Sequence, residues 1–76
     1  MSTLKELKIG GVAKIVKNNA KGAIKQRFMD MGITKGTMVK VIKVAPLGDP
    51  IEVEIRGYNL SIRKEDADRI LVEEMD

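Results

Sequence analysis

The sequence predicts a small, mainly β domain that covers residues 1–76. Short apolar segments, rich in Val and Ile, are separated by turn residues at intervals of about 8–12 residues, which is typical of a small barrel or sandwich. At 76 residues the chain is long enough for one domain at most. Apolar residues make up 43% of it and are almost all aliphatic, so a small core can form without disulfides. About five strands and one short helix are expected.

The first predicted strand covers residues 12–17. It follows Gly10-Gly11. Before it, Leu4, Leu7 and Ile9 are expected to pin the N-terminal segment onto the core in an extended form.

A short α-helix is predicted at about residues 20–31. There the apolar residues recur on one helical face, at positions Ala20, Ile24, Phe28 and Met31. Asn18 or Asn19 is expected to cap the start. Gly32 is expected to end the helix in the left-handed conformation, with Ile33 folding back onto it.

The next two strands flank a loop that contains two prolines. Residues 38–44 form a β-branched strand. Residues 45–50 cannot form an interior strand and should project as a loop. Ile51, Val53 and Ile55 alternate with charged residues, which predicts a strand with one buried and one wet face.

The last part of the chain completes the series of strands. Gly57-Tyr58 is predicted to form a tight two-residue turn into a strand over residues 59–63. A helical turn is expected near residues 64–68. Ile70 and Val72 then form a last short strand.

The residue types present argue against an enzyme. Without His or Cys, the usual nucleophile dyads, zinc ligand sets and imidazole bases are missing. Carboxylates gather at Glu52 and Glu54, and at Glu65, Asp66 and Asp68, where we expect solvated charges. These groups could hold a hard divalent cation weakly, but the spacing of a dedicated calcium loop is missing. No cofactor is firmly implied.

The charge distribution leaves a nucleic-acid partner as an alternative. Residues 1–43 carry ten Lys/Arg and two Asp/Glu, whereas residues 44–76 carry four Lys/Arg and nine Asp/Glu. A basic first half suits a small barrel that binds nucleic acid. Only Tyr58 would be left to stack on a base, however, because Phe28 is assigned to the core. If the two parts intermix in one sheet, their charges pair locally.

The absence of Cys suits a reducing cytoplasm, and no apolar segment has the length of a signal peptide or a membrane span. We therefore expect a soluble cytoplasmic domain.

Several segments together resemble the FeoA family, ferrous iron transport protein A. The resemblance runs over nearly the whole chain and rests on Leu4-Lys5-Glu6-Leu7 before Gly10-Gly11, Arg27-Phe28-Met29-Asp30-Met31-Gly32-Ile33, Gly36-Thr37, Pro46-Leu47-Gly48-Asp49-Pro50, and Leu60-Ser61-Ile62-Arg63-Lys64-Glu65-Asp66-Ala67. It implies an SH3-like barrel that takes part in ferrous iron uptake by interacting with the cytosolic part of the membrane transporter FeoB. Contact with a membrane would then be indirect, through the transporter.

The resemblance also implies a second alternative, because similar domains form C-terminal modules of iron-dependent repressors. An Fe(II)-binding or regulatory module is therefore kept beside the transport role. The chain begins at Met1 and shows no helix-turn-helix, which favours the stand-alone accessory. Among the motif residues, Arg27, Asp30 and Arg63 are expected to form ion pairs that tie the helix to the barrel.

Leu47 is the predicted partner contact, because it sits at an exposed tip stiffened by proline and has no evident core role. Tyr58, at another predicted turn, is a second candidate. The full set of predicted partner-binding residues is Pro46, Leu47, Gly48, Asp49 and Tyr58.

Overall fold

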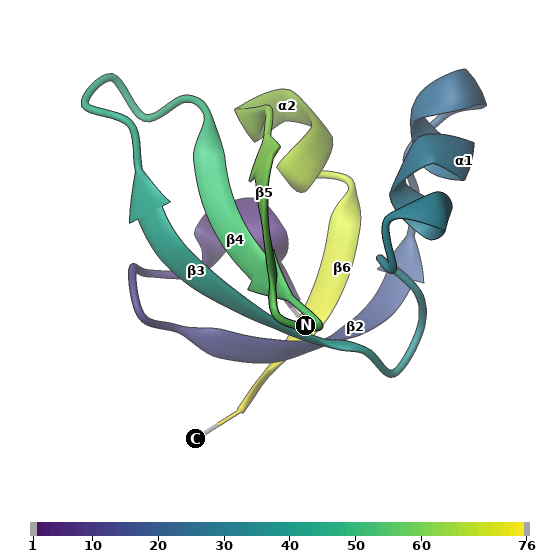
Figure 1. The fold of residues 1–76 in the computed structure, drawn as a ribbon, viewed down its shortest axis with the longest axis horizontal. Helices are drawn as coiled ribbons and strands as arrows, with labels where there is room; N and C mark the ends of the chain where they lie inside the picture. The colour runs from purple at the N-terminus through teal and green to yellow at the C-terminus, as the bar shows by residue number, and fades with distance from the viewer. Residues whose placement is uncertain (1, 76) are drawn as a thin grey trace.

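One coiled antiparallel sheet of six strands organises the chain (Figure 1). The computed structural model describes residues 2–75. Its elements are β1 (Ser2–Thr3), a 3-10 helix (Leu4–Glu6), β2 (Val12–Asn18), α1 (Gly22–Asp30), β3 (Met38–Val44), β4 (Ile51–Ile55), β5 (Tyr58–Ile62), α2 (Lys64–Ala67) and β6 (Ile70–Met75). The mainly β prediction with one short helix and a helical turn is confirmed.

The strand order is β1-β6-β2-β3-β4-β5, so β1 and β5 are the two edges of the sheet. The barrel is therefore open between these two strands. Five strands were predicted and the sixth is β1, which has only two residues, Ser2 and Thr3. Two polar residues carry no apolar alternation, which explains why the sequence did not reveal this strand.

Alternating aliphatic residues of the strands fill the core as predicted. In β4, Ile51, Val53 and Ile55 are buried while Glu54 is exposed. Burying one such side chain contributes on the order of 1.5–3 kcal/mol. The buried strand residues are Ala13, Ile15, Val39, Val41, Ile51, Val53, Ile55, Ile62, Ile70 and Val72.

The N-terminal segment differs from the prediction. Leu4 and Leu7 are buried, but the segment forms a 3-10 helix instead of an extended chain. The Thr3 N–H donates to Glu6 Oε1 at 2.8 Å, which fixes this turn locally. Ile9 is 64% exposed, because Gly11 N–H donates back to the Lys8 carbonyl at 2.8 Å and this tight turn places Ile9 at its tip.

The start of α1 also differs from the prediction. The helix begins at Gly22, its N-cap is Lys21, and no side chain caps it. Asn18 Oδ1 accepts from the Ala20 N–H at 3.0 Å, and its amide donates to the Lys25 carbonyl at 3.2 Å. Asn18 therefore stabilises a local turn before the helix, which competes with extending the helix back to residue 20.

The predicted helix end is confirmed. Gly32 has φ +97° and Ile33 is fully buried. The Ile33 N–H donates to the Phe28 carbonyl at 2.9 Å, and the Gly32 N–H donates to the Met29 carbonyl at 3.1 Å. This is the hydrogen-bond pattern of a Schellman motif, which needs a left-handed residue where Gly32 stands.

The β4–β5 turn is shifted by one residue from the prediction. Its two residues are Arg56 and Gly57, with φ of +54° and +83°, and Tyr58 already pairs with Ile55. Two positive φ angles define a type I′ turn. This placement leaves Tyr58 in an extended conformation, which aromatic side chains favour.

Candidate partner-binding site

The loop between β3 and β4 presents the most exposed of the large apolar side chains in residues 2–75. Leu47 is 95% exposed at the tip of this loop. Behind the tip, Gly48 N–H donates to the Ala45 carbonyl at 2.7 Å and Ala45 N–H donates to the Pro50 carbonyl at 3.0 Å. Hydrogen bonds across the base and the two prolines restrict the loop, so that Leu47 would lose little freedom on docking.

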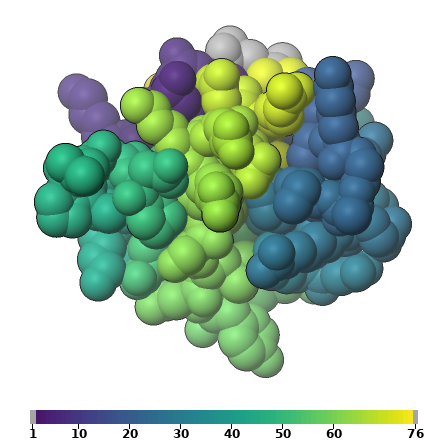
Figure 2. All heavy atoms as spheres, turned by 90° about the horizontal axis from the view of Figure 1, so that it is seen from above, coloured from purple at the N-terminus to yellow at the C-terminus, as the bar shows by residue number. Residues whose placement is uncertain are grey.

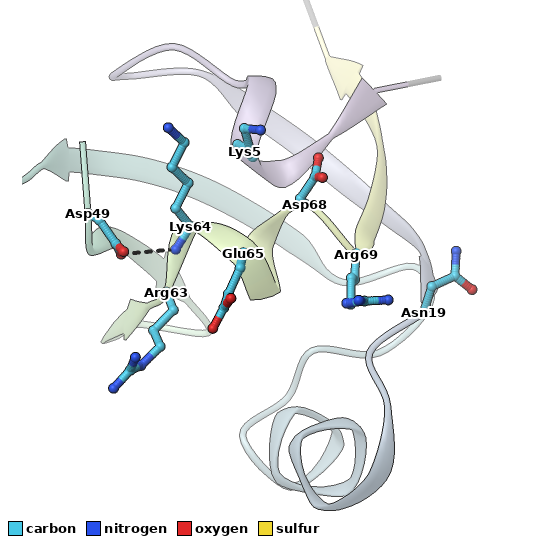
Figure 3. A pocket seen from close by; sticks show the side chains of 8 residues that line it. All are labelled: Lys5, Asn19, Asp49, Arg63, Lys64, Glu65, Asp68 and Arg69. Carbon is cyan, nitrogen blue, oxygen red and sulfur yellow. Dashed lines mark hydrogen bonds between the residues drawn. The ribbon is translucent and has the colours of Figure 1, made fainter. Parts of the chain in front are cut away.

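Asp49 ties this loop to α2. Its Oδ1 accepts a hydrogen bond from the Lys64 backbone N–H at 3.0 Å, as Figure 3 shows. Lys64 is the first residue of α2, whose N-cap residue Arg63 makes no side-chain cap of its own. Asp49 therefore accepts from a backbone N–H that would otherwise bond to water, and it fixes the loop to the start of α2.

Replacing Asp49 with alanine is expected to destabilise the domain by about 0.5–2 kcal/mol, the range for losing a capping acceptor. Urea unfolding would measure the change in the free energy of unfolding. Asp49→Asn is the matched control, because asparagine keeps an acceptor oxygen at nearly the same place. This variant should lose less free energy of unfolding than Asp49→Ala. Equal losses in the two variants would contradict a role for the hydrogen bond.

The structure does not bring the two predicted contacts together. Tyr58 is 73% exposed, as a contact would need, but it pairs with Ile55 at the far end of β4 from the Leu47 loop. Four strand steps separate Ile51 from Ile55, which is about 14 Å at 3.4 Å per residue. Tyr58 therefore lies outside the surface around Leu47.

Basic and acidic residues intermix across the sheet. The register pairs Lys14 with Glu73, Lys40 with Glu54, and Lys43 with Glu52. The basic strands β2 and β3 therefore lie between the acidic strands β6 and β4. Opposite charges on directly facing strand residues attract each other. The basic first half and the acidic second half of the sequence therefore lie on neighbouring strands of one sheet.

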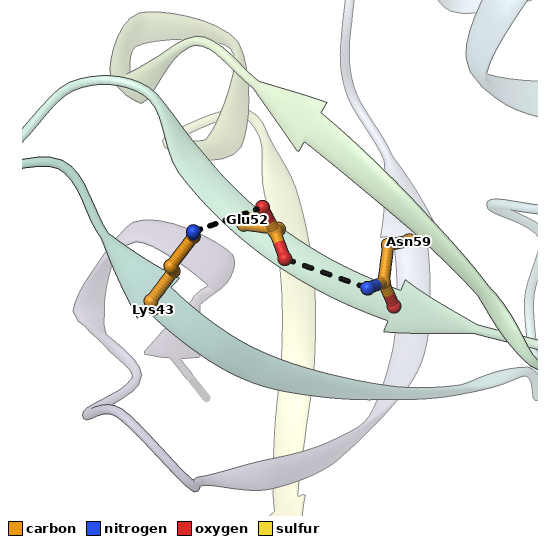
Figure 4. Close-up of polar contacts among 3 residues, drawn as sticks. All are labelled: Lys43, Glu52 and Asn59. Atoms are coloured by element: carbon orange, nitrogen blue, oxygen red, sulfur yellow. Dashed lines mark hydrogen bonds and ion pairs between the residues drawn. The ribbon is translucent and has the colours of Figure 1, made fainter.

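The ion pairs expected at the motif residues are not formed. Within the described part of the chain, the ion pair found joins Lys43 Nζ to Glu52 Oε1 at 3.9 Å, and Glu52 also accepts a long hydrogen bond from Asn59 (Figure 4). Asp30 instead accepts a hydrogen bond from Gln26 at 2.9 Å, one helical turn away. That local partner satisfies Asp30 without help from the barrel.

A shallow polar depression lies beside α2, between the Leu47 loop and the end of β2 (Figure 3). Its lining mixes both signs of charge, including Lys5, Asp49, Arg63, Glu65, Asp68 and Arg69. Across residues 2–75, no three His, Cys, Asp or Glu side chains gather closely enough to hold a metal ion. In the same residues, no helix has the length and apolar character needed to cross a membrane.

A second groove, which the sequence did not reveal, runs between β5 and α1. Its apolar part includes Ile24 and Phe28 of α1, Met31 directly after that helix, and Leu60 and Ile62 of β5. In Figure 2 the green and yellow-green surface of β5 and α2 lies next to the blue surface of α1. The apolar period of the predicted helix indicated that Ile24, Phe28 and Met31 face inward. Only the strand order, with β5 at an edge, shows that part of this face borders an open groove.

Residues 2–74 match the FeoA domain family. In Porphyromonas gingivalis, an Fe(2+) transport protein A/Fe(2+) transporter FeoB fusion protein is 41% identical to this chain over 70 residues. The match covers 92% of this chain and 8% of the fusion protein. Most of that protein therefore has no counterpart here.

Solved structures share the fold. The FeoA protein from Chlorobium tepidum has a TM-score of 0.93 and 40% identity, and the match covers 97% of this chain and 70% of that one. FeoA from Stenotrophomonas maltophilia, a prokaryotic SH3 domain protein solved in complex with zinc, has a TM-score of 0.85 and 27% identity. That match covers 96% of this chain and 91% of the other. The expected SH3-like fold is confirmed.

Proposed function

The chain belongs to the FeoA family, and from that premise we propose that it is an accessory of ferrous iron uptake that binds the cytosolic part of a FeoB-type transporter. In this proposal the domain works on the cytoplasmic side of the membrane and catalyses no reaction. The observation that carries the proposal is the fusion protein, in which a relative of this chain and a FeoB transporter form one polypeptide.

Fusion supports binding for a physical reason. Two domains joined by a linker meet at an effective concentration that can reach about the millimolar range, so even a weak contact between them is populated. A separate chain that serves the same transporter needs a contact with enough affinity of its own. Leu47 on its restricted loop is the best-suited anchor, because burying one leucine contributes about 1.5–3 kcal/mol.

The alternatives have weaker support. A nucleic-acid partner would favour an unbroken basic surface, whereas β2 and β3 are flanked by acidic strands. Stacking on bases would fall to Tyr58 alone, since Phe28 is 4% exposed. An Fe(II)-binding regulatory module would need a group of ligands, and within residues 2–75 no three carboxylates lie close enough together to form one.

Uptake of radioactive ferrous iron tests the proposal in cells that lack the native copy of this chain. The deletion should lower the initial uptake rate, and expression of the wild-type chain should restore it. Expression of Leu47→Asp at equal protein levels should not. An uptake rate that the deletion leaves unchanged would overturn the proposed role in transport.

A further inference from the structure

The β5 edge carries backbone groups that point away from the sheet. In a type I′ hairpin, the residues that flank the two-residue turn, here Ile55 and Tyr58, form a hydrogen-bonded pair. Because the pairs alternate along the ladder, Asn59 and Ser61 fall at non-hydrogen-bonded positions. Their N–H and C=O groups are therefore directed outward, away from β4.

These outward groups have no backbone partner elsewhere in residues 2–75. Beyond the β4–β5 ladder, no backbone hydrogen bond joins Asn59 or Ser61 to another described residue. Both residues are exposed. An unpaired strand edge of this kind is a template for a further strand, because the incoming backbone supplies the missing donors and acceptors.

The groove beside this edge has room for an added chain, and part of its lining is apolar. It has a volume of about 680 Å³ and lies between β5 and α1. Ile24, Met31 and Leu60 are half-buried and pack against the core, so their outer surfaces are available to an incoming side chain. Alternate residues of an added strand would point toward this lining, and apolar residues fit there.

Two arginines indicate the charge of the occupant. Arg27 of α1 and Arg63 at the end of β5 both line the groove. In the described residues neither makes an ion pair, and both are exposed. Because no carboxylate of the described residues pairs with either guanidinium, both are available to an occupant that brings a carboxylate, and arginine binds carboxylates through paired hydrogen bonds. Glu65 and Asp66 also line the groove, and they would disfavour acidic residues beside α2.

The groove continues into the surface that carries Leu47. Arg63 and Glu65 line both the groove and the polar depression, which also includes Asp49 of the Leu47 loop. Figure 2 shows the teal loop, the yellow-green α2 and the blue α1 following one another across one face. One partner could therefore contact the loop and the groove together.

We propose that β5 binds an extended segment of the transporter's cytosolic part, in which apolar and acidic residues alternate, as an added strand between β5 and α1. This inference rests on the proposed function. A second copy of this chain is a poorer occupant. Its β5, Tyr58–Ile62, carries no charged residue that could pair with Arg27 and Arg63.

Amide hydrogen exchange of the ¹⁵N-labelled domain tests this inference, with the purified cytosolic part of the cognate FeoB as the probe. The Asn59 and Ser61 amides should exchange at least about tenfold more slowly in the complex. Tyr58 and Leu60, whose amides already bond to β4, should change less and serve as internal controls. A complex in which Asn59 and Ser61 keep their rates would overturn the added strand and leave the proposed function standing.

Two other outcomes would also overturn the inference. Absence of any complex would remove both the added strand and the proposed function. Slower exchange of these amides with rising concentration of the domain alone would assign the edge to a second copy of the chain.

A pair of variants at Ser61 separates the backbone contact from the side chain. Ser61→Pro removes the outward N–H and, at an edge strand, leaves the bonds to β4 in place. It should weaken binding to the FeoB probe at least about tenfold, which corresponds to 1.4 kcal/mol. Ser61→Ala keeps the N–H and should bind within about twofold of wild type. Equal binding by both variants would contradict the proposal, and if Ser61→Pro does not fold, the exchange rates decide.

Discussion

Replacing Leu47 with aspartate is expected to weaken binding to the cytosolic part of FeoB by roughly 10- to 150-fold. Leu47 is 95% exposed in the free domain, so a contact that buries it would contribute about 1.5–3 kcal/mol. Aspartate removes this contribution and adds the cost of placing a charge in an apolar contact. A fluorescence titration of the labelled domain would give the dissociation constants.

Two controls make this result specific. Leu47→Lys carries the opposite charge and should lose a similar amount of affinity if the contact is apolar. Met38→Lys changes another exposed apolar residue, at the start of β3 and therefore at the opposite end of that strand from the loop, and should bind like wild type. Tighter binding by Leu47→Lys than by wild type would show that charge governs the contact, which would contradict an apolar anchor.

Phe28→Ala is expected to cost about 3–5 kcal/mol of stability, the range for removing a buried phenylalanine. Phe28 is the one buried aromatic residue of residues 2–75 and joins α1 to the core. A chain of 76 residues has a total stability on the order of 4–11 kcal/mol. Urea unfolding should therefore show a large decrease in the midpoint, and at the lower end of this range the variant would be largely unfolded even without denaturant.

Phe28→Leu is the matched control for this prediction. Leucine keeps most of the apolar volume, and tolerated hydrophobic replacements usually cost less than about 1.5 kcal/mol. A Phe28→Ala variant that loses less than about 1 kcal/mol would contradict the role of Phe28 as the anchor of α1.

Features with strong local signals were predictable from the sequence. The alternation of Ile51, Val53 and Ile55 fixed the buried face of β4, because strand side chains alternate between the two faces of a sheet. The end of α1 was equally clear, since Gly32 followed by an apolar residue is the signature of a Schellman motif. Both signals lie within a few neighbouring residues.

Features that depend on competing local bonds were predicted less well. Asn18 has the right residue type for a helix cap, but its side chain bonds to Ala20 and Lys25 instead. Ile9 has an apolar side chain, but a turn with the Lys8 carbonyl at its base exposes it. In both cases the residue type allows two outcomes, and hydrogen bonds between neighbours select one.

The candidate site also combines features that the local sequence predicts with features that it does not. The exposure of Leu47 followed from two prolines and the absence of a core role, and the structure confirms it. The bond from Lys64 to Asp49 crosses fifteen residues, and the β5 groove depends on which strand lies at the edge. This hydrogen bond and this groove both depend on contacts between distant parts of the chain, and no local sequence pattern encodes such contacts.

The most direct test of the central claim is a titration of the labelled domain with the purified cytosolic part of its cognate FeoB, alongside DNA and RNA at two salt concentrations. We expect saturable binding to FeoB that depends only modestly on salt, with no comparable binding to nucleic acid. Failure to bind FeoB, together with nucleic-acid binding that falls steeply with salt, would contradict this expectation.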